Sequence, residues 1–265
     1  MKRMYTMIKS LSFNKRVLQE CPLCGSEQPI VLKGFVKDIQ DETKTVLAQD
    51  KGYSFCNCHN IYYTAWKNID QEVYDIDYVN KYAGTESLMA NYGVVYFDKI
   101  QELQNGKTGS LLEIGSINDG LLNYAKDFGH KPCGLDIPKR DSDHKMFSGD
   151  FETIDFKNKY DIVFASHIFE HFLDPIGAVE KCNSILNDDG VLFVAMPDPY
   201  FIDYANVYLW GHWHVEEHHI MWDMESFIDV VESKGFTCEL KHRSTGTKGF
   251  ICWGDFHLIF KKKGN

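Results

Sequence analysis

The sequence predicts an α/β protein whose larger part is a doubly wound, mostly parallel sheet. From Ser110 onward, short apolar segments of strand length alternate with amphipathic segments of helical period. The chain then closes with two β-rich stretches and no helix between them. These stretches predict a terminal antiparallel hairpin.

The first half of this alternation contains three expected strands and one expected helix. Leu111–Ile114 is predicted as a buried strand, and a helix is expected to begin at Gly120. Two further strands are expected at Cys133–Leu135 and Asp161–Ala165.

The second half opens with a clear helix start. Asp174 is a good N-cap, Pro175 suits the first helical position, and Gly190 is expected to end the helix. The remaining elements are a buried strand at 191–196, a helix from Asp223 to Gly235, and the β-rich stretches 236–241 and 251–260.

The chain before Ser110 differs in composition. β-prone stretches (PIVLKGFV, TKTVLA and IYYTAW) precede a tyrosine-rich zone with apolar residues at helical spacing, which a break at QNGKTG ends. We therefore expect three parts: a β module at 1–66, a helical linker at 67–107 and the α/β domain at 108–265.

Charge and hydropathy exclude several classes of protein. With 28 Lys and Arg against 38 Asp and Glu, the formal net charge of −10 argues against a protein that binds nucleic-acid phosphates. No apolar run approaches the roughly 18 residues that cross a bilayer, and no apolar segment of a secretory signal follows the basic start. We expect a cytoplasmic protein that does not insert into membranes.

Four of the eight cysteines are clustered: Cys21, Cys24, Cys56 and Cys58. In a reducing compartment, such a cluster indicates a metal site rather than disulfides. The other four (Cys133, Cys182, Cys238 and Cys252) stand singly among apolar neighbours and are expected in the core.

The cluster has the spacing of a structural zinc site. C-P-L-C-G at 21–25 is a good zinc knuckle, because Gly25 can adopt positive φ. The second half, C-N-C-H-N, is irregular. Either Cys58 is the fourth ligand, or His59 is, with Asn60 in the position that glycine usually takes.

The segment LLEIGSINDGLL carries the strongest signal for a bound ligand. Glu113 ends a strand, Gly115 lets the backbone approach a ligand closely, and a helix N-terminus follows at Gly120. A dinucleotide loop has three glycines in G-x-G-x-x-G and its acidic residue after the second strand. A carboxylate before the first glycine suits a cationic amine better than a pyrophosphate, which favours S-adenosylmethionine.

Two further motifs agree with this cofactor. Asp136 ends the next strand, where a carboxylate can accept from both ribose hydroxyls. GDF at 149–151 offers Asp150 to the adenine amino group and the ring of Phe151 beside the base.

Together with YDIVFASHIFEHFLDP at 160–175, these motifs resemble the class I S-adenosylmethionine-dependent methyltransferases, which have a Rossmann-like fold. The resemblance covers about residues 80–240 and implies a cofactor site of Glu113, Gly115, Asn118, Gly120, Asp136, Asp150, Phe151 and Ser166.

A narrower resemblance concerns YAGTESLM and EHHIMWDMESF, which look like segments of zinc-containing nucleotide-sugar C-methyltransferases. It implies that Tyr82 and Ser87 contact the cofactor, in a segment that closes over it, and that His218 and Glu217 are catalytic base and partner. Those enzymes continue with a further C-terminal domain whereas this sequence stops at Asn265, so we do not expect their substrate to be inherited unchanged.

The stretch HWHVEEHH offers several candidates for the base. A histidine of near-neutral pKa can remove the acceptor's proton, and His218 is the first candidate, with His214 and His171 as alternatives. A metal site or a packing role are the other interpretations of these histidines. The tryptophans of this region are interpreted either as a wall that stacks on a sugar or as core: Trp210, Trp213 and Trp222.

The expected reaction is methyl transfer to a small polar acceptor, a hydroxyl of a sugar, nucleotide-linked sugar or glycan precursor. Three alternatives stay open: C-methylation of a keto sugar nucleotide, a zinc-finger RNA methyltransferase, and a non-catalytic binding protein. The net charge of −10 weighs against the RNA enzyme.

Overall fold

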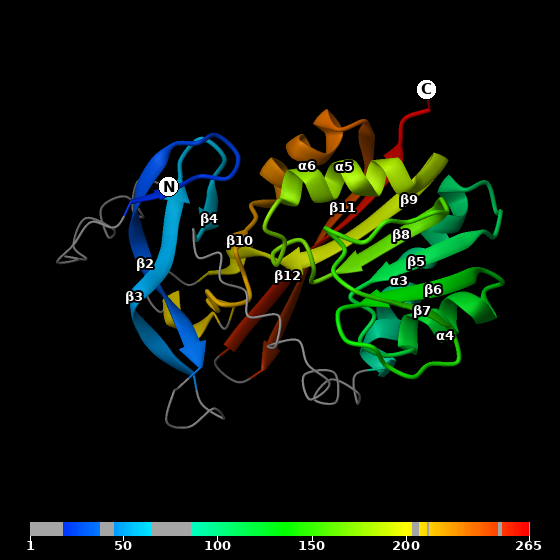
Figure 1. Cartoon of the computed structure of the whole chain (residues 1–265), viewed down its shortest axis with the longest axis horizontal. Helices are drawn as coiled ribbons and strands as arrows, with labels where there is room; N and C mark the ends of the chain where they lie inside the picture. The colour runs from blue at the N-terminus through cyan, green and yellow to red at the C-terminus, as the bar shows by residue number, and fades with distance from the viewer. Residues whose placement is uncertain are drawn as a thin grey trace. The chain divides into compact units, whose positions relative to one another are not determined.

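The computed structural model describes residues 18–37, 45–64, 86–202, 207–210, 212–248 and 251–264. The chain forms two compact units, each assembled from segments distant in the sequence (Figure 1). Unit 1 comprises Met1–Ile69, Pro197–Phe227 and Arg243–Phe256, and unit 2 comprises Asp70–Met196, Ile228–His242 and His257–Asn265. The domain boundaries expected at 66/67 and 107/108 stay predictions.

The sheet of unit 2 has seven strands in the order β11-β12-β9-β8-β5-β6-β7. β5 pairs in parallel with both β6 and β8, β6 with β7, and β8 with β9. The strands are β5 (Ser110–Ile114), β6 (Lys131–Asp136), β7 (Lys145–Ser148), β8 (Tyr160–Ser166), β9 (Leu186–Pro197), β11 (Phe236–Lys248) and β12 (Ile251–Lys262).

This order confirms the predicted doubly wound α/β fold. The chain runs outward from β5 through β6 to β7, then returns to the other side of β5 with β8 and β9. The direction of winding therefore changes at β5. Ligands of such sheets bind at the carboxyl ends of the strands beside this switch point.

Helices cover both faces of this sheet (Figure 1). α3 (Glu86–Leu103) packs on α4 (Gly120–Asp127), and α4 packs on β5 and β6. α5 (Pro175–Ile185) lies on the opposite face, and α6 (Met224–Ser233) begins in the last residues of unit 1's middle segment and continues into unit 2. The core includes Phe97, Ile100, Leu111, Phe164 and Phe193, all at most 1% exposed.

The start of α5 is confirmed, but its predicted end is wrong. Asp174 accepts a hydrogen bond of 2.9 Å from the Gly177 amide, as an N-cap does. The helix ends at Ile185 rather than Gly190, because Leu186 already pairs with Tyr160 of β8. An irregular register then precedes Val191, and Asp189, at φ 60°, rather than the glycine, takes the left-handed conformation.

Unit 1 contains a five-stranded sheet in the order β1-β2-β3-β4-β10, with antiparallel pairing between neighbours. Its strands are β1 (Leu18–Glu20), β2 (Glu27–Lys37), β3 (Thr45–Cys56), β4 (Ile61–Tyr63) and β10 (Ile220–Met221), and two short 3-10 helices lie at Pro199–Phe201 and Val207–Leu209. β10, far along the chain, thus completes the sheet of the N-terminal cysteine region.

Three of the tryptophans in unit 1 are core residues. Trp210, Trp213 and Trp222 are at most 2% exposed, and the rings of Trp210 and Trp213 meet edge to face. Of the single cysteines, Cys133 and Cys182 are buried as expected and Cys238 is half-buried, whereas the side chain of Cys252 lies outside the described residues. In the part of the chain that the structure describes, no helix has the length and hydropathy to cross a membrane.

Candidate functional site

The loop between β5 and α4 packs tightly against β6 and Ile168 at Gly115. Gly115 has φ 73° and donates a hydrogen bond of 2.8 Å to the Leu135 carbonyl of β6. A Cβ on this residue would lie 2.1 Å from Cδ1 of Ile168. Both facts make glycine the residue that fits here.

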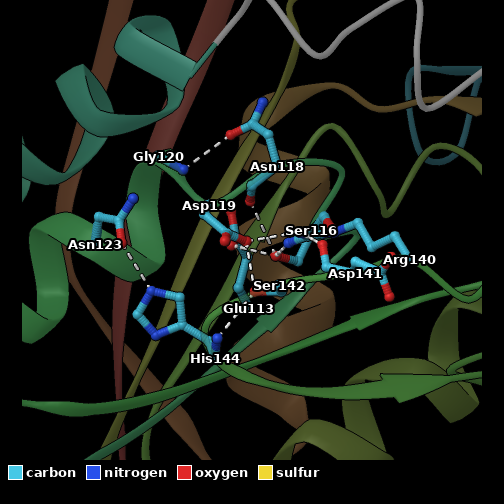
Figure 2. Close-up of polar contacts among 10 residues, drawn as sticks. All are labelled: Glu113, Ser116, Asn118, Asp119, Gly120, Asn123, Arg140, Asp141, Ser142 and His144. Atoms are coloured by element: carbon cyan, nitrogen blue, oxygen red, sulfur yellow. Dashed lines mark hydrogen bonds and ion pairs between the residues drawn. The ribbon is translucent and has the colours of Figure 1, made fainter.

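The turn into α4 uses two polar residues differently. The Asn118 Oδ1 accepts a hydrogen bond of 3.0 Å from the Gly120 amide at the start of the helix. Asp119 occupies the N-cap position, yet its side chain makes no capping hydrogen bond. Its Oδ1 lies 2.6 Å from Arg140 Nη1 and 2.8 Å from Ser142 Oγ, beyond the end of β6 (Figure 2).

Glu113 is 4% exposed, and its Oε2 accepts a hydrogen bond of 2.8 Å from Ser116 Oγ. The pKa of Glu113 is raised to about 8, chiefly by burial; the nearby charges of Asp136 and Asp119 contribute to the rise, and Ser116 and Arg140 oppose it. A buried carboxylate of this kind gains most from a cationic ligand. Sequence reasoning missed Ser116, Asp119 and Arg140; the signal available was a single arginine shortly after the strand that ends in Asp136.

Two buried oxygen atoms beside Glu113 have no hydrogen-bond partner among the described residues: Asp136 Oδ2 and Ser166 Oγ. Asp136 ends β6 and Ser166 ends β8, the two strands that flank β5. Asp136 Oδ1 accepts from the Ile137 amide at 2.8 Å, and burial raises the pKa of this carboxyl to about 6. Because buried polar atoms are rarely left unsatisfied, this pair points to a ligand at the strand ends.

The GDF motif lies next to this edge, since the Gly149 amide donates to the Asp136 carbonyl at 2.9 Å. Asp150 Oδ1 accepts from the Glu152 amide at 2.8 Å. Phe151 is 3% exposed, and its ring packs against Phe172 with centroids 5.5 Å apart. The roles of Asp150 and Phe151 toward adenine stay predictions.

The side chains of Tyr82 and Ser87, the two cofactor contacts expected before residue 108, are not among the described parts of the structure. Tyr82 lies outside the described residues, and Ser87 falls in the first turn of α3, where the backbone alone is described. Both stay predictions.

The histidine segment of unit 1 holds one ring in a defined state. His218 is 9% exposed, and its Nδ1 lies 2.7 Å from the His212 carbonyl oxygen. A carbonyl only accepts, so Nδ1 carries the hydrogen and the neutral ring has its lone pair on Nε2. A ring in this tautomer can act as a base or bind a metal through Nε2.

The other candidate catalytic residues are His214, Glu217 and His171. The ring of His214 meets that of His218 edge-on at 6.1 Å. Burial, and then the charge of Glu217, raise the pKa of Tyr53, whose hydroxyl donates to the His218 carbonyl at 2.9 Å. His171 belongs to unit 2, where its Nε2 lies 4.0 Å from Glu170 Oε1.

The cysteine cluster of unit 1 brings four ligand atoms together. Those of Cys21, Cys24, Cys56 and His59 all lie within 4.8 Å of one another. Cys24 Sγ lies 3.7 Å from Cys56 Sγ, which in turn lies 3.5 Å from His59 Nδ1. Two thiolates bound to one zinc at about 2.3 Å would be about 3.8 Å apart. Cys58 is exposed and is not in this group.

The backbone of both turns matches a pair of metal knuckles. Gly25 has φ 69° and Asn60 has φ 53°, so asparagine takes the glycine position of the second turn. Burial raises the pKa of Cys21, whereas hydrogen bonds from Ser26 lower that of Cys24. The donor set of three thiols and one imidazole is one that zinc accepts.

The family model described as "Methyltransferase domain" matches residues 89–241. A search of curated proteins gives no match.

Three solved structures share the fold at low sequence identity. A chain of the complex between the Haloferax volcanii Trm112 methyltransferase activator and a methyltransferase is 15% identical, with a TM-score of 0.53 over 70% of this chain and 97% of that chain. A protein named as a sarcosine dimethylglycine methyltransferase, from Galdieria sulphuraria, is 13% identical, with a TM-score of 0.50 over 66% and 85%. The PH0226 protein from Pyrococcus horikoshii OT3 is 15% identical, with a TM-score of 0.50 over 65% and 90%.

Proposed function

The chain belongs to the methyltransferase domain family and is an S-adenosylmethionine-dependent enzyme, and from this premise we propose that it methylates a hydroxyl of a sugar, a nucleotide-linked sugar or a related glycan precursor.

One observation carries the placement of the cofactor: a buried carboxylate on β5, with a buried oxygen on each flanking strand that has no hydrogen-bond partner among the residues the structure describes. In this placement Glu113 receives the ammonium group of the cofactor, and Asp136 accepts from its ribose hydroxyls. Ser166 supplies a hydroxyl at the third strand end. The acidic side chains of this site suit the ammonium group and the ribose hydroxyls of the cofactor. The loop between β5 and α4 lacks the three glycines of a loop that binds a pyrophosphate. When bound, S-adenosylmethionine supplies an electrophilic methyl group.

For the acceptor, we assign His218 as the base and Glu217 as the residue that orients or polarises the hydroxyl. The support is the fixed tautomer of His218, which leaves Nε2 to take a proton. Likeness of residues 82–89 and 217–227 to nucleotide-sugar methyltransferases favours a sugar acceptor. The formal charge of −10 disfavours RNA.

The cysteine cluster, we infer, holds one structural zinc ion through Cys21, Cys24, Cys56 and His59. Four protein ligands leave no open coordination position for chemistry. Cysteines that bind a metal instead of forming disulfides suit a reducing compartment such as the cytoplasm.

The experiment is a transfer assay with methyl-labelled S-adenosylmethionine and a panel of nucleotide sugars, free sugars and bulk RNA. We expect label in a sugar hydroxyl. Carbon–carbon bond formation, seen by NMR of the product, would instead identify a C-methyltransferase. Label in RNA together with salt-sensitive RNA binding would overturn the sugar assignment.

A further inference from the structure

Arg140, in the loop after β6, is tied to the loop between β5 and α4 through each of its three guanidinium nitrogens. Its Nε donates to the Ser116 carbonyl at 2.7 Å, its Nη2 to Ser116 Oγ at 3.1 Å, and its Nη1 to Asp119 Oδ1 at 2.6 Å (Figure 2). The side chain is 7% exposed. The guanidinium therefore spans the loop from Ser116 to Asp119.

The direction of hydrogen bonding continues from Arg140 to Glu113. A guanidinium only donates, so Ser116 Oγ accepts from it and its own hydrogen is available to an acceptor. Glu113 Oε2 is the nearer acceptor at 2.8 Å, compared with 3.3 Å for the Asn118 carbonyl oxygen. Arg140 thus fixes the Ser116 hydroxyl as a donor to the Glu113 carboxylate.

The Asp119 side chain bonds to Arg140 and does not cap its own helix. At the N-cap of α4, an aspartate side chain would ordinarily stabilise the helix by accepting a hydrogen bond from one of its first backbone amides. Here its carboxylate accepts from Arg140 and from Ser142. The Asp119 carboxylate therefore holds the Arg140 guanidinium instead of capping α4.

A second set of hydrogen bonds links the loop after β6 to α4. Ser142 Oγ accepts from the His144 amide at 3.0 Å, and His144 Nε2 lies 2.8 Å from Asn123 Oδ1 on the helix (Figure 2). The segment that carries Arg140 is therefore anchored on both sides, so its guanidinium is positioned before any ligand arrives.

We propose that Arg140 is a positioning residue for the amino-acid end of the cofactor: it shapes the loop from Gly115 to Asp119 and, through Ser116, aims the Glu113 carboxylate at the ammonium group. This rests on the proposed placement of S-adenosylmethionine. The positive charge of Arg140 also lowers the pKa of Glu113, against burial, Asp136 and Asp119, which raise it. Loss of that charge should therefore move ionisation of Glu113 to higher pH.

Two ligands separate this role from a general structural one. S-adenosylhomocysteine contains the ammonium group, whereas 5′-methylthioadenosine has the same adenine and ribose but no amino-acid end. Binding of both is measured by calorimetry between about pH 6 and 9, a range that brackets the pKa of Glu113. The proteins are the full chain, R140M, R140K and K234M, the last removing a charge from the Lys234–Glu180 ion pair of the same unit.

R140M should bind S-adenosylhomocysteine about tenfold or more weakly, the size expected when a charged hydrogen-bond network is lost. Its pH midpoint for binding should rise, and its affinity for 5′-methylthioadenosine should stay within about twofold of the unmodified chain. R140K, which keeps the charge but not the planar fork, should weaken S-adenosylhomocysteine binding without moving the midpoint. K234M should match the unmodified chain.

Equal loss of both ligands in R140M, or an unmoved pH midpoint, would overturn the proposal. If circular dichroism shows R140M unfolded, R140K decides: selective loss of S-adenosylhomocysteine supports the role, and equal loss or none rejects it. Failure of the unmodified chain to bind either ligand contradicts the cofactor placement itself and removes the role of Arg140 with it.

Discussion

His218 donates a hydrogen bond of 2.7 Å from ring Nδ1 to the backbone carbonyl oxygen of His212. The backbone of His218 is fixed as well, since its amide donates to the His214 carbonyl at 2.7 Å and its own carbonyl accepts from Tyr53. Ring orientation and tautomer are thus set by main-chain atoms, which side-chain substitutions elsewhere leave in place.

His218→Ala should lose turnover and keep the cofactor. Removal of a general base lowers kcat by about 10²- to 10⁴-fold, and we expect the affinity for S-adenosylhomocysteine to stay the same. Calorimetry and the methyl-transfer assay measure the two quantities separately.

His214→Ala and His171→Ala are the matched controls, because each removes one imidazole that sequence reasoning also offered as the base. Both should retain most of the kcat. Full turnover in His218→Ala, or loss of turnover confined to one of the controls, would move the role of base to another residue.

Glu113→Gln should stabilise the ligand-free protein at alkaline pH. With its pKa raised to about 8, the folded chain keeps a proton that the unfolded chain loses near pH 4.5. The folded state binds more protons in this window, so the free energy of unfolding falls as pH rises through it. Glutamine has no such proton, and we expect the variant to be about 1–3 kcal/mol more stable at pH above about 8.

Denaturant unfolding at several pH values measures this effect, and the advantage should disappear as pH falls to about 4.5. Glu102→Gln, on α3 where the side chain is 71% exposed, is the control for net charge. The same Glu113→Gln variant should bind S-adenosylhomocysteine more weakly at every pH at which the glutamate is ionised. An advantage independent of pH would show that the ionisation of Glu113 is not its source.

Local patterns predicted the parallel sheet because each strand is a short apolar run and each helix has a recognisable start, as at Asp174 and Asp223. The end of α5 was misplaced, since pairing of Leu186 with β8 outweighs the preference of Gly190 for a helix end. That β10 joins the N-terminal sheet depends on a pairing between Tyr63 and Ile220, and no local pattern encodes so distant a contact.

In the candidate site, Glu113 and Asp136 could be predicted because each lies at the carboxyl end of a strand. Arg140 could not, since its role depends on how the loop after β6 folds back onto Ser116. The choice between Cys58 and His59 was open for the same reason: spacing permits both, and the turn conformation at Asn60 decides which side chain faces the other thiols.

The zinc proposal predicts a difference between two neighbouring residues. The purified chain should contain about one zinc ion, and Cys56→Ser and His59→Ala should each lose it, because each removes one of four ligands. Cys58→Ser should keep it. Mass spectrometry of metal content measures this, and loss of zinc in Cys58→Ser with retention in His59→Ala would make Cys58 the fourth ligand.

Gly115→Ala tests whether the cofactor loop tolerates a side chain. The substitution places a Cβ in a backbone of φ 73° and 2.1 Å from Cδ1 of Ile168. Left-handed strain costs about 1 kcal/mol and the overlap adds about 1–3 kcal/mol, so the variant should unfold more easily and bind S-adenosylhomocysteine weakly. Ile168→Val removes the Cδ1 atom, so in the double variant the closest overlap is relieved, while Cγ1 at 2.9 Å and the backbone strain remain. A double-mutant cycle by denaturant unfolding should therefore give a favourable coupling of about 1 kcal/mol, and strictly additive effects would show that Ile168 does not restrict this position.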